Sequence, residues 1–104
     1  MFRVYEEVLD VIRLLREVVV AFDRRDPDLA RQLRRAAASV ALNIAEANGS
    51  RGRNRGARFH TALGSMRETL ACVQVGHALG YVDEYPEVAR RIDRICGALY
   101  SLAR

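Results

Sequence analysis

The spacing of the apolar residues constrains this 104-residue chain more than any other feature. In four separate stretches, apolar side chains recur at steps of three and four residues, which places them on one face of a helix. The four stripes are Val4, Val8, Val11, Leu15, Val18, Phe22; Leu29, Leu33, Ala36, Val40, Ile44, Ala47; Phe59, Leu63, Met66, Leu70, Val73, His77; and Val88, Ile92, Ile95, Leu99, Leu102. This pattern predicts an all-α chain with helices over residues 3–23, 27–48, 54–79 and 84–103.

Residues at the predicted boundaries support these helices. Asp26 followed by Pro27 is typical of an N-cap and the first helical position. Gly80 follows the third stretch directly, where a glycine often ends a helix, and Asp83 is predicted to cap the fourth helix. Short links between successive helices make neighbours antiparallel. We therefore expect a single domain over residues 1–104, folded as an antiparallel up-down-up-down four-helix bundle.

The first predicted helix carries more apolar surface than one bundle core needs. At 100° per residue, its apolar positions from Leu14 round to Ile12 cover an arc of roughly 160°. Phe2, Leu9 and Val20 extend the apolar surface further. Contiguous apolar patches often mark interfaces, so this helix predicts self-association. Scattered exposed apolar residues, which are common on protein surfaces, are the alternative.

Several sequence features bear on where the chain works. No apolar run reaches the length of about 20 residues that a membrane span needs, and the first residues lack a signal-peptide pattern. Cys72 and Cys96 belong to no disulfide or metal-binding motif. We expect a reduced, cytoplasmic chain without a membrane partner, in which both cysteines act as small apolar packing residues.

The positive charge of the chain is concentrated in its middle. The 17 basic residues are all arginine, the acidic residues number 13, and the formal net charge is +4. Residues 31–58 contain seven arginines against Glu46 alone. These arginines are Arg31, Arg34, Arg35, Arg51, Arg53, Arg55 and Arg58.

Guanidinium groups pair with phosphates, so this stretch predicts salt-dependent binding to the backbone of RNA or DNA. No aromatic residue lies within residues 51–58, so base stacking is not predicted. The alternative is a solvated loop between helices that only keeps the chain soluble.

Few residues have a pattern typical of catalysis or metal binding. Glu46 and Glu68 lie on facing helices, but a di-metal bundle needs further carboxylates and Glu-x-x-His motifs. The favoured interpretation is a hydrogen-bonded polar layer. Ser65 has no base at a suitable spacing, His77 is expected in the core or at an interface, and His60 on a flank. The sequence therefore predicts no enzyme, no cofactor and no metal.

The middle of the chain resembles a known bacterial family. The matching segments are residues 32–40, 43–49, 58–59, 62–65, 68–69 and 79–81, which include the elements Asn-Ile-Ala-Glu and Ala-Leu-Gly-Ser. They resemble the four-helix-bundle family of 23S rRNA intervening-sequence proteins. That family also includes the accessory variability determinant of diversity-generating retroelements. Ala47 departs from the glycine that the family usually has there.

The resemblance implies a homo-oligomer, typically a five-fold barrel of bundles with a basic surface, and no catalytic residues. For the retroelement members it implies binding to structured nucleic acid and to a reverse transcriptase. Together these expectations describe a non-catalytic, oligomeric, nucleic-acid-binding accessory protein. The alternative is an oligomeric protein-interaction scaffold that does not bind nucleic acid.

Overall fold

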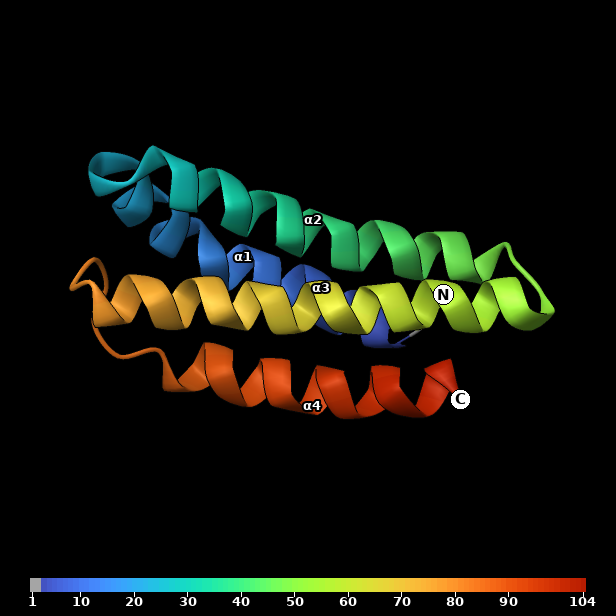
Figure 1. Cartoon of the computed structure of the whole chain (residues 1–104). Coiled ribbons are helices and arrows are strands. Elements are labelled where there is room, and N and C mark those ends of the chain that lie inside the picture. The colour runs from blue at the N-terminus through green and yellow to red at the C-terminus, as the bar shows by residue number, and fades with distance from the viewer. Residues whose placement is uncertain (1–2) are drawn as a thin grey trace.

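A computed structural model describes residues 3–104 of the chain (Figure 1). It consists of α1 (Arg3–Arg25), α2 (Pro27–Asn48), α3 (Gly52–Ala78) and α4 (Pro86–Ala103). The all-α prediction is confirmed, and each helix boundary lies within two residues of the predicted one. Within residues 3–104, no helix has the length and apolar character that crossing a membrane requires.

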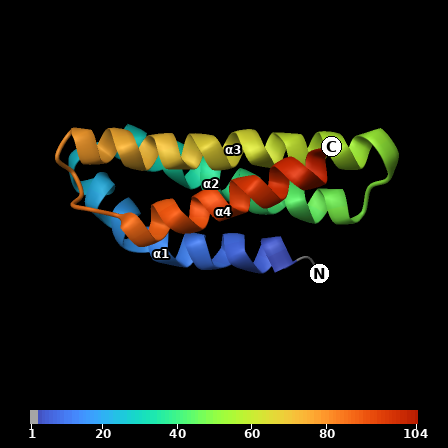
Figure 2. The same ribbon diagram turned by 90° about the horizontal axis from the view of Figure 1, so that it is seen from below.

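The four helices pack side by side into an elongated bundle measuring 43 × 23 × 19 Å. The chain turns back on itself at each connection, so successive helices run in opposite directions (Figures 1 and 2). Contacts between α1 and α2, α2 and α3, α3 and α4, and α4 and α1 close the ring of neighbours. Both figures also show the α2–α3 connection projecting beyond the ends of α1 and α4.

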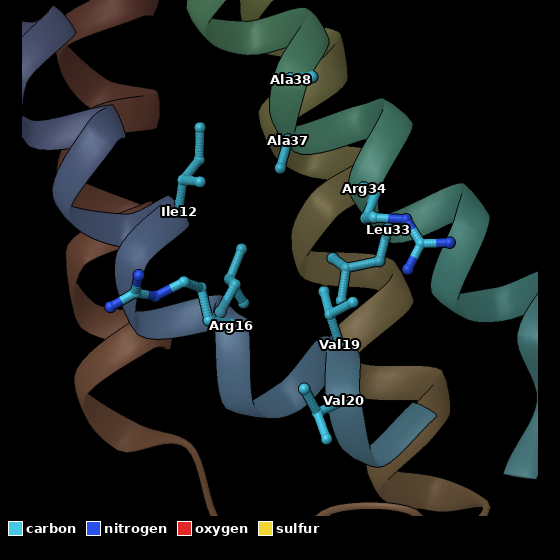
Figure 3. Close-up of a pocket in the computed structure, with 9 residues that line it drawn as sticks. Ile12, Arg16, Val19, Val20, Leu33, Arg34, Ala37 and Ala38 are labelled. Atoms are coloured by element: carbon cyan, nitrogen blue, oxygen red, sulfur yellow. The ribbon is translucent and has the colours of Figure 1, made fainter. Parts of the chain in front are cut away.

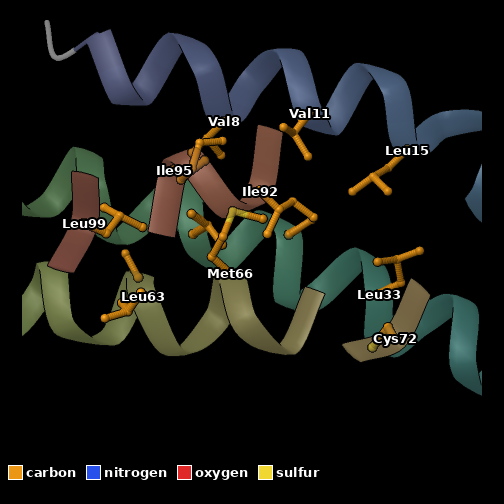
Figure 4. Close-up of a cluster of buried hydrophobic side chains, with 14 of the residues drawn as sticks. Val8, Val11, Leu15, Leu33, Leu63, Met66, Cys72, Ile92, Ile95 and Leu99 are labelled. Carbon is orange, nitrogen blue, oxygen red and sulfur yellow. The ribbon is translucent and has the colours of Figure 1, made fainter. Parts of the chain in front are cut away.

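The core is formed by the faces that the apolar stripes predict. In Figure 4, Val8, Val11 and Leu15 of α1 point towards Ile92 and Ile95 of α4 across the interior. All five of these side chains are at most 2% exposed. Burial of such aliphatic groups is the main favourable contribution to folding, at roughly 1.5–3 kcal/mol for each side chain.

The buried face of α3 differs from the predicted stripe at its C-terminal end. Six of its eight buried positions form two series with a seven-residue spacing, which is typical of left-handed bundle packing. One series is Phe59, Met66 and Val73, and the other is Ala62, Thr69 and Gly76. The predicted stripe shares the first series, but its second series was Leu63, Leu70 and His77, which lies one residue further round the helix at each turn. Of these three, only Leu63 is buried.

His77 was predicted to lie in the core or at an interface. The first of these two alternatives is wrong. His77 is exposed, and its ring meets that of Tyr85 edge-on with 5.3 Å between centroids. Gly76 takes the buried place beside it. A Cβ atom added at Gly76 would overlap the ring of Phe22, which is fully buried.

Two of the three predicted boundary signals are confirmed. The Asp26 carboxylate accepts a hydrogen bond from the Leu29 amide at 3.1 Å and so caps α2. Gly80 adopts a φ of +82°, and the amides of Gly80 and Tyr81 donate to carbonyls in the last turn of α3. This is the double hydrogen bond of a Schellman helix end.

The predicted cap at Asp83 is wrong. Helix α4 begins at Pro86, and Tyr85 occupies the N-cap position without a side-chain hydrogen bond. The helical conformation is sterically disfavoured for a residue that precedes proline. The helix therefore cannot begin at Glu84, and the first helical residue is the proline itself.

Candidate nucleic-acid interface

The structure divides the seven predicted arginines into two groups at opposite ends of α2. Arg31, Arg34 and Arg35 lie in the first half of α2. The other four follow the end of α2, where Figure 1 shows the chain turning into α3. At 1.5 Å per residue, the length of α2 between the groups is about 20 Å. The seven residues therefore do not form one continuous surface.

The first group is largely neutralised by nearby carboxylates. Arg34 Nη1 lies 3.1 Å from Asp23 Oδ2, and Arg31 pairs with Asp28 one turn before it. Arg35 is exposed beside a polar hollow between α2 and α3. Exposed pairs of this kind contribute little to stability, but they reduce the local positive charge.

The second group, which we call the arginine tip, consists of Arg51, Arg53, Arg55 and Arg58. Gly52 between them has a φ of +59° and turns the chain directly into α3. Three of the four arginines thus belong to the first two turns of a helix. The sequence predicted this for Arg55 and Arg58, and the earlier start of α3 adds Arg53.

No acidic residue stands in the sequence between residues 47 and 67, on either side of the arginine tip. Within residues 3–104, Arg51, Arg53 and Arg58 form no ion pair with a carboxylate. The first turn of α3 also contains no acid. The positive charge of the tip is therefore added to the positive end of the α3 helix dipole.

Contacts with neighbouring side chains hold part of the tip in place. The Arg55 guanidinium carbon lies 5.3 Å from the centroid of the buried Phe59 ring. Arg58 Nη1 donates a long 3.5 Å hydrogen bond to Asn43 Oδ1 on α2. A polar hollow of about 310 Å³ lies beside them, lined by Ser50, Asn54, Ala57, Arg58 and Thr61. The tip thus combines cations with hydroxyl and amide groups.

A polar layer does join α2 and α3, but the predicted glutamates do not form it. Ser39 Oγ and Ser65 Oγ lie 2.8 Å apart, and Asn43 Nδ2 donates to the Ser39 carbonyl at 2.9 Å. Glu46 and Glu68 are both exposed. Small hydroxyl groups fit where the two helices approach closely, whereas the longer carboxylates extend into solvent. Within residues 3–104, no group of three or more His, Cys, Asp or Glu side chains could hold a metal ion.

The two cysteines pack among apolar residues. Cys72 is buried in the core and Cys96 is half-buried, and both are free thiols. Burial raises the pKa of each thiol above its ordinary value, with the nearby Glu68 carboxylate adding to the effect at Cys72. A raised pKa leaves little thiolate near neutral pH, so these groups are poor nucleophiles.

An open apolar groove of about 520 Å³ runs between α1 and α2 (Figure 3). Ile12, Val19 and Val20 line it from α1, and Leu33 and Ala37 line it from α2. Val20 is 52% exposed. The predicted excess of apolar surface on the first helix is therefore present, although Phe2, which was part of that prediction, lies outside the described residues.

Comparison with models of known protein families identifies the family of this chain. The model of the 23S rRNA-intervening sequence protein family matches residues 2–101. The chain belongs to this family. The match includes all of α1, α2 and α3 and most of α4, so it covers the whole bundle. The searches of curated proteins and of solved structures gave no match.

In this member of the 23S rRNA-intervening sequence protein family, α4 brings further residues to the arginine tip. The Ala103 carbonyl oxygen lies 3.4 Å from the position that a Cβ atom would take at Gly56. The end of α4 therefore lies beside the start of α3, and it carries Tyr100 and Arg104. Sequence reasoning missed these two residues, although the predicted antiparallel pairing of the third and fourth helices was a signal that could have brought them to this end of the bundle.

Proposed function

We propose that this chain is a non-catalytic, oligomeric accessory protein that binds the backbone of RNA or DNA through its arginine tip. The observation that carries the proposal is the charge of the tip. Four guanidinium groups lie within eight residues at a projecting end of the bundle, with no acid in that part of the sequence. Arginine pairs with phosphate through two parallel hydrogen bonds, and clustered arginines attract polyanions.

The position of these arginines supports a polyanionic ligand. Cations at the N-terminus of a helix are unfavourable, because the helix dipole already makes that end positive. Each cation at the first turn costs roughly 0.3–1 kcal/mol at an exposed site, so Arg51, Arg53 and Arg55 lower the stability of the fold. A bound phosphate would offset this repulsion and accept hydrogen bonds from the amide groups at the start of α3.

The apolar groove between α1 and α2 supports the oligomeric part of the proposal. A second copy seated on the groove would cover Val20 and its neighbours, and an assembly would repeat the tip on each copy. Several tips that reach one polymer bind it far more tightly than one tip does. Native mass spectrometry tests this part. We expect five chains of 11.7 kDa each, as the family resemblance suggests, and a monomer would contradict it.

The binding experiment compares the two arginine groups. Fluorescence anisotropy with labelled RNA and DNA is measured over a salt series for the wild type and for Arg51→Ala/Arg53→Ala/Arg55→Ala/Arg58→Ala. Removing four phosphate contacts should lower the slope of log affinity against log salt by about 3. Unchanged binding by the fourfold variant would refute the proposal. Arg31→Ala/Arg34→Ala is the matched control and should have a smaller effect, because both residues pair with carboxylates.

A second candidate function is a protein-interaction scaffold in which the arginine tip only aids solubility. The apolar lining of the α1–α2 groove favours it, since such a surface fits a partner protein as well as a second copy. The scaffold would have no affinity for nucleic acid at roughly physiological salt.

The resemblance to the retroelement accessory protein makes a reverse transcriptase the partner to test for either candidate. Co-purification of the chain with a diversity-generating retroelement reverse transcriptase is the direct measurement. Retention of the complex after nuclease treatment would favour the scaffold. Loss of the complex would favour contact through a shared nucleic acid.

A further inference from the structure

We propose that the face of α3 and α4 beside the arginine tip binds an unpaired nucleobase, with Tyr100 as the stacking platform. This inference rests on the proposed function and makes it more specific: the ligand is single-stranded RNA or DNA, or an unpaired loop. The sequence indicated no base stacking, because the arginine run itself contains no aromatic residue. The fold supplies one from α4.

The site is a shallow hollow of about 210 Å³ at the end of the bundle that carries the tip. Its lining comes from two helices and consists of His60, Leu63, Arg67, Tyr100, Ala103 and Arg104. Tyr100 is 58% exposed, and the Arg104 guanidinium carbon lies 5.6 Å from the centroid of its ring. Nucleobases stack on tyrosine rings and on guanidinium planes, and this hollow offers both.

A line of basic residues joins the hollow to the tip. Arg53, His60 and Arg67 are spaced seven residues apart, which places them on one side of α3 at intervals of about 10 Å. Arg104 adds a further cation from α4. The described residues that line the hollow include no acid. A strand whose phosphates follow the basic line from the tip would bring a base to Tyr100.

Two glycines leave the helix surface bare next to the hollow. Gly64 lies between His60 and Arg67 on α3, and Gly97 lies one turn before Tyr100 on α4. Both are exposed, and no atom of the described chain comes within 4 Å of the position of an added Cβ. Glycine within a helix is destabilising, and no internal contact requires it here. A flat ligand that approaches the backbone closely would account for both positions.

These features favour single strands over other anionic ligands. A duplex hides the faces of its bases in the stack and would use only the cations. An acidic protein would also use the cations but would gain little from an exposed tyrosine ring. Stacking on an aromatic ring together with backbone contacts is the usual mode of binding to single-stranded nucleic acid.

The test separates stacking from charge. Affinities are measured for a short labelled oligonucleotide of mixed sequence, for an abasic oligonucleotide with the same number of phosphates, and for a duplex. We expect Tyr100→Ala to weaken binding of the normal single strand about 5- to 150-fold, which is the usual contribution of one stacked base. The same substitution should leave binding of the abasic strand and the duplex unchanged. Ribose and deoxyribose versions of the strand show which nucleic acid the site prefers.

Two further variants serve as controls. Tyr100→Phe keeps the ring and should bind nearly as the wild type does. Val75→Ala removes an exposed apolar side chain at the opposite end of α3 and should leave all affinities unchanged. Because Tyr100 is largely exposed, its substitution should preserve the helical circular dichroism signal.

The outcomes distinguish this inference from the proposed function. If binding depends on salt but Tyr100→Ala and the abasic strand have no effect, the stacking site is refuted and the arginine tip stands. If no oligonucleotide binds, both are refuted. If Tyr100→Ala leaves affinity unchanged but alters the mass of the assembly, this face is an interface between copies, and the nucleobase site is refuted.

Discussion

The turn between α1 and α2 and the turn between α2 and α3 are both short, but they use their polar residues differently. At the first turn, the Asp26 carboxylate caps α2 and also accepts a 3.4 Å hydrogen bond from the Tyr81 hydroxyl. Arg25 Nη1 donates to the Gly80 carbonyl at 3.0 Å. These contacts tie the first turn to the α3–α4 connection at the same end of the bundle.

The second turn is held by local contacts with α2: Ser50 Oγ donates to the Glu46 carbonyl at 2.9 Å, and Arg58 donates the long hydrogen bond to Asn43. Arg51 occupies the N-cap position of α3 with an extended backbone, and its side chain caps nothing. The residues around it contribute positive charge to a helix end that is already positive. A serine or an aspartate at position 51 could cap α3, as Asp26 caps α2.

Under the proposed function, one end of α2 contributes to the stability of the fold and the other end binds nucleic acid. At the first turn, carboxylates meet amide groups and arginines of the same chain. At the arginine tip, Arg51, Arg53 and Arg58 have no carboxylate partner within residues 3–104. Substitutions at the first turn should therefore change the free energy of unfolding. Substitutions at the tip should mainly change affinity for nucleic acid.

The largest effect on stability is expected at Gly76, which packs against the first turn. Gly76→Ala places a methyl group where the buried Phe22 ring lies. Overpacking of this kind costs about 1–3 kcal/mol, and we expect a value near the upper end because the ring has no space to move. Urea denaturation measures the change.

A matched glycine in the same helix provides the control. Gly64 is exposed with nothing within 4 Å of an added Cβ, so Gly64→Ala should stabilise the chain by about 0.5–1 kcal/mol. Equal stability of the Gly76→Ala variant and the wild type would show that Phe22 does not occupy this place.

The next effect is expected at Asp26. Asp26→Ala removes the cap of α2 and the acceptor of the Tyr81 hydroxyl, and the loss of such a cap costs about 0.5–2 kcal/mol. Thermal unfolding measures the change. Asp28→Ala nearby removes an exposed ion pair with Arg31 and an acid from the first turn of α2, but no capping hydrogen bond, and should cost about 1 kcal/mol or less. If the two variants were equally stable, the first turn would not depend on its cap.

Most of the fold could be predicted because its signals are local. The apolar stripes, the Asp26 cap and the Gly80 helix end each depend on residues within a few positions of one another. The errors have specific causes. His77 was placed in the core because the stripe followed the larger side chains at positions 63, 70 and 77, whereas the packed face of α3 passes through the small residues Ala62 and Gly76. Asp83 was chosen as a cap although Pro86 prevents the helix from beginning before it.

The candidate site could be predicted only in part. The run of charge at the arginine tip is visible in the sequence, but the length of α2 separates it from Arg31, Arg34 and Arg35. Tyr100 lies near the start of α3 because α4 runs back along it, and the short link between the two helices predicted this direction. Which residues of α3 and α4 lie opposite each other depends on how the helices pack, and local spacing does not determine that.

The smallest effect is expected from giving the second turn the kind of cap that the first turn has. Arg51→Ser introduces a side chain that can accept a hydrogen bond from an amide in the first turn of α3, and it removes one cation from the positive helix end. We expect stability to rise by about 1 kcal/mol in thermal unfolding. Affinity for nucleic acid should fall at the same time, with the salt slope reduced by roughly 0.7–0.9 for one lost phosphate contact. A gain in stability without any loss of affinity would mean that Arg51 is not part of the binding surface. A loss of stability would mean that the arginine supports the turn after all, and the contrast between the two ends of α2 would then be weaker than the structure suggests.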